Sequence, residues 1–551
     1  MLNKLVFLKN FFSSPLVVSI IFFLLLQLPV FNYGFNYRDE GYLLNNAQRI
    51  SNGEIPYVNF SLALTPGAFY IQAIAFKLFG NYVVSDRILY VICVVFILFL
   101  SSRFFKFSKY LNYISLLFLA LVYTGMGAFA SYNMYGVVFI MTALLLFNKL
   151  REGNNIYFYS FLIGLINSLL FMTKQTYGFI FFFSLLFLLV FFTERKYLFK
   201  NTLFYFVGNL TLLTIVLLIF YFNGILNQLV NSVLYFAFAV KNDRLPFIFT
   251  SILFVPFFIF VVKFIKKFNF KKMGIMFIFF LVFFFLYIFI APTRIAYLVS
   301  FYKEPTIYYF ILFFTSPLIL ITLFFRSRNK QKRQIVITSI AALSLFLASA
   351  FSGRDYTTVI VTAPLYIPLI IYFFKFKCKK IRLPVSNIAI VLFLILFVFP
   401  SVVSLTKAYG KRYGISLSKE NYGSLNIKNM SYINIPISQK NDLKIVANYI
   451  ESKTSQNDKL LCIPYCSFVN YLTERRNASY FSFFYKFNKN DQERVIDDIK
   501  GNINSTILIQ RPNVIEKEAN YEDNNLNLLK KFISKEYKLV KTTENFYIYK
   551  K

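Results

Sequence analysis

The sequence predicts a polytopic α-helical membrane protein, and three observations lead to that class. Of 551 residues, 58% are hydrophobic, 21% aromatic and only 15% charged, whereas about a quarter of the residues are charged in a typical soluble domain. About thirteen apolar runs approach the roughly 20 residues that cross a bilayer as a helix. Lysine and arginine gather in alternate loops between these runs. The composition excludes a soluble globular enzyme, a disordered protein and a coiled coil, and the lack of histidine excludes histidine-based catalysis and metal ligation.

The first 405 residues hold all of the expected spans. They are about 12–33, 84–102, 110–129, 132–148, 156–173, 175–193, 201–222, 246–263, 274–291, 307–325, 335–352, 357–374 and 385–405. The first lacks a small-residue cleavage site and is interpreted as a retained span. With a cytoplasmic N-terminus, 25 of the 35 basic residues in this part fall in cytoplasmic loops, as the positive-inside rule requires. An odd number of spans then places the C-terminal segment outside the cell. This charge distribution argues against a nucleic-acid partner.

The first outer loop, residues 34–83, is expected to hold two helices that lie in the membrane interface. Residues 40–50 place Leu43, Ala47 and Ile50 on one helical face. Residues 66–79 are apolar but too short to span the membrane, and counting them as a span would place every later lysine cluster outside. Thr65 is expected to cap this second helix, with Pro66 in its first turn and Gly80 at its end.

From about residue 406 to 551, charged and asparagine residues increase and apolar runs shorten. Helical patterns near 443–453, 466–475, 491–500 and 525–534 alternate with strand-like runs at 459–464, 505–510, 537–541 and 545–549. This alternation predicts a small extracytoplasmic α/β domain with its own core. Cys462 and Cys466 fall within it, and their spacing alone leaves a disulfide possible but unproved.

Acidic residues in the membrane part lie mostly on the outer side. Seven of nine are outside by this topology, and three of them are in the first outer loop. Asp39-Glu40 follows the first span directly. Two neighbouring carboxylates beside an apolar surface can raise each other's pKa or share a divalent cation, and either suits a general base. The simpler interpretation is a helix N-terminus, where acidic residues are favoured.

The sequence around this acid pair resembles the first outer loop of GT-C fold glycosyltransferases, in the branch of protein mannosyltransferases and aminoarabinose transferases. The shared features are the acid after the first span, Tyr42 with Ala47, the Gly53-Glu54-Ile55-Pro56-Tyr57 turn and Thr65-Pro66. Asp86-Arg87 at the mouth of the second span and the Thr173-Lys174-Gln175 turn extend the resemblance. About 50 residues match closely, and the remainder matches in layout.

The resemblance implies an inverting glycosyltransferase. Such an enzyme takes a sugar from a polyprenyl-phosphate donor and passes it to a glycan, lipid or protein acceptor on the outer face of a bacterial plasma or inner membrane. Asp39 is the expected base and Glu40 its partner or a metal ligand. If a metal binds, carboxylate ligands favour Mg²⁺ or Mn²⁺, and metal dependence stays open. Tyr42 and Tyr57 flank this site and are the expected substrate-binding residues.

A leaving phosphate at the membrane surface needs cations. The basic residues expected to hold it lie at outer span ends or in outer loops, and they are Arg87, Lys174, Arg294 and Arg354. The alternative for each is snorkelling to lipid headgroups, or, for Arg354, a plain ion pair with Asp355. Two other functions remain open, a transporter or flippase of lipid-linked glycans and a glycan polymerase or ligase. A transporter should carry charges in mid-span, and these spans have almost none.

Overall fold

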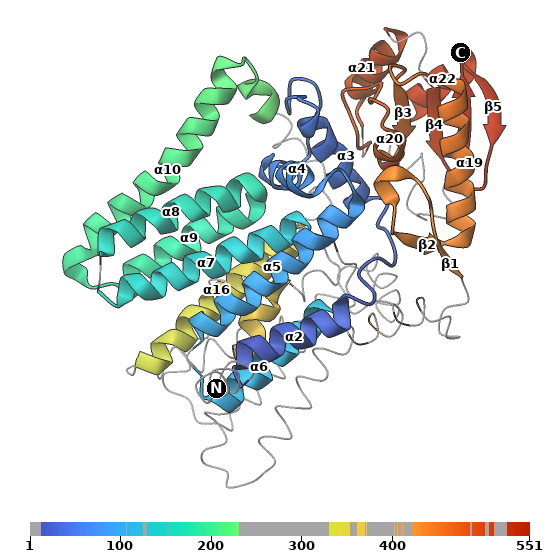
Figure 1. Ribbon diagram of the computed structural model, residues 1–551. Coiled ribbons are helices and arrows are strands. Elements are labelled where there is room, and N and C mark those ends of the chain that lie inside the picture. The colour runs from blue at the N-terminus through green and yellow to red at the C-terminus, as the bar shows by residue number, and fades with distance from the viewer. Residues whose placement is uncertain are drawn as a thin grey trace, which may run out of the picture.

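A computed structural model of the 551-residue chain describes a helical bundle and an α/β unit, which are connected by the first outer loop (Figure 1). The described residues are 13–105, 107–124, 129–153, 155–230, 330–352, 361–369, 371, 402, 405, 409, 412, 421–484, 487–501, 506–511 and 526–551. The predicted spans 246–263, 274–291 and 307–325, and nearly all of 385–405, lie outside these residues.

The bundle consists of apolar helices at the positions that the sequence predicts. They are α2 (Pro15–Gln27), α5 (Val83–Phe104), α6 (Lys109–Tyr123), α7 (Tyr132–Arg151), α8 (Ile156–Thr173), α9 (Gln175–Phe192), α10 (Leu198–Phe222) and α16 (Lys330–Ser352). Within the described part of the chain, five helical segments are long and apolar enough to cross a membrane. Helix α7 packs on both α5 and α8. Helix α8 also packs on α10, and α9 packs on α16. The chain is therefore a polytopic helical membrane protein.

Two helices are shorter than the apolar runs that contain them. Helix α2 ends at Gln27 and continues as turns, although the run extends to about residue 33. Pro29 explains this end, because it has no backbone N–H to donate to the carbonyl four residues before it and so cannot continue the helix. Helix α6 ends at Tyr123, and Thr124 is already extended.

Helices α8 and α10 approach each other closely at two glycines. A Cβ atom on Gly164 would lie 2.2 Å from the Tyr205 carbonyl oxygen, and one on Gly208 would lie 2.1 Å from the Phe161 carbonyl oxygen. Near this crossing, the Asn167 Nδ2 donates to Asn209 Oδ1 at 2.9 Å and the Ser168 hydroxyl to the Asn209 carbonyl at 2.6 Å. Small residues combined with interhelical hydrogen bonds are the usual means of helix association in membranes.

The two short helices expected in the first outer loop are present, as α3 (Asp39–Ser51) and α4 (Gly67–Phe79). They pack on each other, and α4 ends at Gly80 as predicted. The expected cap of α4 is wrong, because the Thr65 side chain makes no capping bond to this helix. Its hydroxyl instead donates to the Phe171 carbonyl at 2.9 Å, at the end of α8.

The C-terminal unit is a four-stranded mixed sheet with helices. Strands β3 (Leu460–Ile463), β4 (Thr506–Gln510), β5 (Lys538–Thr542) and β6 (Phe546–Lys550) lie in the order β3-β4-β6-β5, and only β3 and β4 are parallel. The helices are α19 (Ile437–Lys453), α20 (Phe468–Thr473), α21 (Lys489–Lys500) and α22 (Asn527–Glu536). A separate antiparallel pair, β1 (Tyr422–Ser424) and β2 (Asn434–Pro436), precedes α19. These helices and strands of the sheet match the predicted positions.

The core of this unit has two parts. One face of the sheet packs on α21 and α22 through residues such as Ile463, Val495 and Leu529. The other part is shared with the first outer loop, because Leu44, Ala47 and Phe76 of α3 and α4 join Leu443, Val446 and Phe468 of α19 and α20 in one buried cluster. The unit thus covers its remaining apolar surface with the first outer loop.

We expect Gly208→Ala to destabilise the bundle, because its new methyl group would overlap the Phe161 carbonyl. Overpacking of this kind costs about 1–3 kcal/mol, and the midpoint of thermal unfolding in detergent should fall. Leu210→Ala is the control, since Leu210 is 57% exposed on the lipid-facing side of α10. Equal midpoints for the two variants would contradict the close crossing.

Candidate active site in the first outer loop

Glu40 and Arg87 form an ion pair that is buried from water. The Arg87 Nη2 lies 2.7 Å from Glu40 Oε1 and donates to Glu40 Oε2 at 3.0 Å, and both side chains are 1% exposed. The same nitrogen lies 3.0 Å from the Gly34 carbonyl oxygen. One arginine on α5 therefore holds both the start of the first outer loop and the first turn of α3.

The Asn36 side chain and the Glu40 carboxylate organise the beginning of α3. Asn36 Oδ1 accepts from the amides of Arg38 at 3.2 Å and Asp39 at 2.9 Å. The backbone N–H of Asn36 in turn donates to Glu40 Oε2 at 3.0 Å. This reciprocal arrangement satisfies helix-end donors in the manner of a capping box. Burial raises the pKa of the Glu40 carboxyl, and the Arg87 guanidinium and the Asn36 amide act against that rise.

Asp39 lies in a different environment from its neighbour. It is exposed, whereas Glu40 is completely buried. Adjacent residues on a helix are about 100° apart, because a turn takes 3.6 residues, so one carboxylate faces the bundle and the other faces solvent. Of the two acids, Asp39 is the one that a substrate can reach.

The described residues do not fit a divalent cation shared by Asp39 and Glu40. The Glu40 carboxylate is already neutralised by the Arg87 guanidinium and accepts a backbone amide. Asp39 faces away from it into solvent. In the described part of the chain, no group of three or more cysteine, aspartate or glutamate residues lies close enough together to hold a metal ion.

Lys174 is buried at the break between α8 and α9. Its Nζ contacts the Asn133 side-chain oxygen and lies 4.8 Å and 4.3 Å from the ring centres of Tyr132 and Tyr177. The side chain is 3% exposed. An ammonium group inside an aromatic cradle at a span end gains cation–π stabilisation, and this one is not presented to bulk solvent.

The two turns that the sequence singled out are in contact. The Thr65 hydroxyl donates a hydrogen bond to the Phe171 carbonyl, and the Thr65 backbone amide donates to Gln175 Oε1 at 3.4 Å. The turn before α4 is thus tied to the Thr173-Lys174-Gln175 turn. Glu40 with Arg87 forms one such tie between the first outer loop and the bundle, and Thr65 with Gln175 forms a second.

Tyr42 and Tyr57 are buried and support the loop from inside. The Tyr42 hydroxyl accepts from the Ala63 amide at 3.1 Å, and the Tyr57 hydroxyl donates to the Leu64 carbonyl at 2.8 Å. Burial raises the pKa of both phenols, so they stay neutral. Tyr57 also has a left-handed backbone, with φ +66°, which is rare for a bulky residue.

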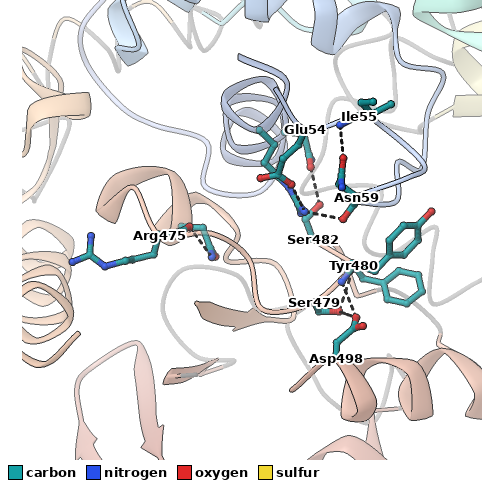
Figure 2. A network of polar contacts seen from close by, with 12 residues as sticks. Glu54, Ile55, Asn59, Arg475, Ser479, Tyr480, Ser482 and Asp498 are labelled. Carbon is teal, nitrogen blue, oxygen red and sulfur yellow. Dashed lines mark hydrogen bonds and ion pairs between the residues drawn. The ribbon is translucent and has the colours of Figure 1, made fainter. Parts of the chain in front are cut away.

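A second charge pair holds the turn that carries Tyr57. Arg49 Nε donates to Glu54 Oε2 at 2.8 Å, its Nη2 donates to the Asn59 carbonyl at 3.1 Å, and its guanidinium lies 4.4 Å from the Phe60 ring centre. The Asn59 side chain accepts from the Ile55 amide (Figure 2). This turn is therefore held on α3 by contacts within the first outer loop.

A segment of the C-terminal unit, residues 479–484, lies along this turn. The Tyr480 hydroxyl donates to the Tyr57 carbonyl at 3.0 Å, and the Ser61 amide donates to the Tyr480 carbonyl at 2.9 Å. The Ser482 hydroxyl donates to Asn46 Oδ1 at 3.0 Å. Asp498 of α21 fixes the segment by accepting from the Ser479 hydroxyl and the Tyr480 amide (Figure 2).

The residue before Asp39 also contacts the C-terminal unit. The Arg38 guanidinium lies 4.9 Å from the Tyr465 ring centre and 5.7 Å from that of Phe483. Tyr465 sits in the short loop between Cys462 and Cys466, which form a disulfide. The C-terminal unit therefore lies directly beside the candidate base. Arg294 and Arg354, the other expected phosphate ligands, fall outside the described residues.

Several residues that position this site were not singled out from the sequence. Asn36, which precedes Asp39 by three residues, carries the helix-start pattern Asn-x-x-Asp and could have been found. The pairing of Arg49 with Glu54 spans five residues and is less regular. The contacts of Tyr480 and Ser482 join segments more than 400 residues apart, and a local pattern gives no signal for them.

The buried ion pair predicts strong coupling between Glu40 and Arg87. Removing one partner leaves an uncompensated buried charge, which costs about 3–5 kcal/mol. We expect Glu40→Gln and Arg87→Gln each to lower the unfolding midpoint strongly, and the double variant to lose much less than the sum. A thermal-unfolding cycle on purified protein measures this. Additive losses would show that the two groups do not act as a pair.

Neither family models nor curated protein sequences match this chain. Among solved structures, the chain is similar to the oligosaccharyltransferase of Archaeoglobus fulgidus in complex with Zn and sulfate, with a TM-score of 0.47 and 13% identity over 90% of this chain and 68% of that one. It is also similar to ArnT from Cupriavidus metallidurans bound to undecaprenyl phosphate, with a TM-score of 0.45 and 11% identity over 97% of each chain. Both are GT-C fold glycosyltransferases, the class that the first-loop sequence resembles.

Proposed function

We propose that this protein is a membrane glycosyltransferase that moves a sugar from a polyprenyl-phosphate donor to an acceptor on the outer face of the membrane. The observation that carries the proposal is the division of the Asp39-Glu40 pair. Glu40 is buried in an ion pair with Arg87, whereas Asp39 is exposed in the first turn of α3. A rigidly held helix start with an accessible carboxylate suits a general base. The resemblance of the loop sequence supplies the reaction class.

In the proposed reaction, Asp39 accepts the proton of the acceptor hydroxyl as its oxygen attacks the anomeric carbon of the donor sugar. The bond between that carbon and the phosphate oxygen breaks, and polyprenyl phosphate leaves with the bonding electrons. Attack from the face opposite the leaving group inverts the anomeric centre. Arg87 acts as a positioning residue, because it holds Glu40 and the Gly34 carbonyl and so fixes the helix that carries Asp39.

The leaving phosphate needs positive charge, and we assign that task first to Arg294 and Arg354. Both are basic residues of predicted outer loops. Arg87 is committed to Glu40, and Lys174 lies between two tyrosine rings at a span end. Lys174 is the next candidate to bind the phosphate. Its neighbour Gln175 accepts a hydrogen bond from Thr65, which places Lys174 close to the first outer loop.

We also propose the topology on which this site depends. Thirteen spans with a cytoplasmic N-terminus put the first outer loop and the unit from residue 406 onward outside the cell. The contacts of residues 479–484 with α3 and its following turn support this, because the loop and the C-terminal unit must then share one side of the membrane. The membrane is expected to be a bacterial plasma or inner membrane.

We expect Asp39→Asn to consume the donor far more slowly than the wild type. Loss of a general base lowers the rate about 10²–10⁴-fold, whereas the exposed position leaves the fold intact. Membranes with wild type or variant at matched expression would be given a panel of radiolabelled polyprenyl-phosphate sugars, and donor consumption measured. Glu152→Gln is the matched control, since Glu152 is an exposed carboxylate that pairs with Lys149 at 2.9 Å, at the end of α7.

Equal consumption by wild type and Asp39→Asn would reject Asp39 as the base. Consumption of no donor by the wild type, together with transbilayer movement of an intact lipid-linked sugar, would instead indicate a flippase. Products that grow by repeated transfer of glycan blocks would indicate a polymerase or ligase.

The topology prediction can be tested with a membrane-impermeant maleimide on intact cells. In a Cys378→Ser background, Lys541→Cys on the exposed strand β5 should react, and Glu152→Cys should react only after the cells are opened. Of the native cysteines, Cys93 is buried and Cys462 and Cys466 are joined. The reverse labelling pattern would overturn the proposed orientation.

A further inference from the structure

The outer end of the first span is joined to the C-terminal unit by backbone hydrogen bonds. The Gly34 amide donates to the Asn434 carbonyl at 2.8 Å, and the Asn434 amide donates to the Asn32 carbonyl at 2.8 Å. Tyr33 and Asn434 form a parallel bridge. Strand β2 is therefore fixed a few residues beyond the end of α2, at the level where the first span leaves the membrane.

Three tyrosines gather at this junction. The ring centres of Tyr33 and Tyr422 are 6.2 Å apart, and the Tyr432 carbonyl accepts from Asn32 Nδ2 at 3.0 Å. Tyr432 is 73% exposed, which is far more than most large side chains of this unit. Its backbone is left-handed, with φ +74°.

An exposed tyrosine in that backbone conformation is unfavourable in water. The left-handed region is strained for a bulky residue, and glycine or asparagine would relieve the strain. An exposed aromatic ring gains nothing from water. At a membrane surface the same ring is favoured, because its apolar body enters the acyl boundary and its hydroxyl stays among the headgroups. The chain has no tryptophan and 40 tyrosines, so tyrosine has to supply this anchoring role.

Two lysines lie next to the segments that carry Tyr422 and Tyr432. Lys428 begins the 3₁₀ turn η4 (Lys428–Met430) that leads to Tyr432, and its side chain is 73% exposed and 3.4 Å from Glu474. The Lys440 side chain lies against Gly423 of β1. Lysine beside an interfacial aromatic adds electrostatic attraction to lipid phosphates.

We propose that these residues, Tyr33, Tyr422, Tyr432, Lys428 and Lys440, form a lipid-binding patch that rests in the headgroup region of the outer leaflet. The Tyr432 ring enters the boundary with the acyl chains. The patch fixes the C-terminal unit against the membrane at the first span, and it does so whatever reaction the protein performs.

The absence of tryptophan allows a direct test. A single tryptophan introduced by Tyr432→Trp can be excited selectively over the tyrosines, and it reports only its own surroundings. The full-length variant would be reconstituted in phosphatidylcholine–phosphatidylglycerol vesicles whose lipids are brominated either near the headgroup or near the acyl-chain ends. Leu210→Trp, on the lipid-facing side of α10, calibrates the deep position. Leu539→Trp, on strand β5 away from the β1–β2 pair, is the water-exposed control (Figure 1).

We expect the Tyr432→Trp variant to lose most of its fluorescence with the shallow bromines and little with the deep ones. The Leu210→Trp variant should show the opposite order, and the Leu539→Trp variant should respond to neither. Quenching of the Tyr432→Trp variant no greater than that of the Leu539→Trp variant would overturn the proposal. Should Tyr432→Trp fail to fold, Tyr33→Trp reports on the same patch and is held to the same outcomes.

Discussion

The Glu40–Arg87 ion pair is the contact on which the arrangement of the first outer loop depends. A carboxylate and a guanidinium that are both cut off from water are tolerated only with good geometry and further hydrogen bonds. Here the Gly34 carbonyl and the Asn36 amide supply those bonds. The pair ties the end of the first span, the first turn of α3 and the start of α5 together. Glu40 faces inward as a result, and Asp39 is left facing solvent.

The C-terminal unit completes the loop rather than standing apart from it. Gly41 allows this, since a Cβ atom there would lie 2.5 Å from the Phe468 Cβ of α20. Tyr37 contributes a ring that packs 4.7 Å from Phe468 and a hydroxyl that donates to Gln439 at 2.8 Å. Arg38 against Tyr465 and Tyr480 against Tyr57 extend the contact from the start of the loop to its middle. Residues on either side of Asp39 are thus held by the C-terminal unit.

Local patterns in the sequence predicted the helices, and they did not predict most of the contacts. Apolar runs located α5 and α7 to α10, and helical periodicity and length located α3 and α4, because burial against lipid or a bundle imposes those patterns. Pro29 lies within the first apolar run and ends helix α2, and the predicted span of about 12–33 did not take it into account. Arg87 was expected to face a phosphate, and its pairing with Glu40, 47 residues away, could not be read from spacing. The disulfide between Cys462 and Cys466 depended in the same way on geometry.

The central claim is that two adjacent carboxylates have separate tasks, with Asp39 serving the chemistry and Glu40 serving the fold. The most direct measurement is the rate of sugar transfer per folded molecule, determined for Asp39→Asn and Glu40→Gln well below their unfolding midpoints. The account predicts a large loss of this rate for Asp39→Asn at an unchanged midpoint, and a lowered midpoint for Glu40→Gln with a much smaller loss of rate. An equal loss of rate in both variants at unchanged midpoints would contradict it, because the two acids would then act together in the reaction.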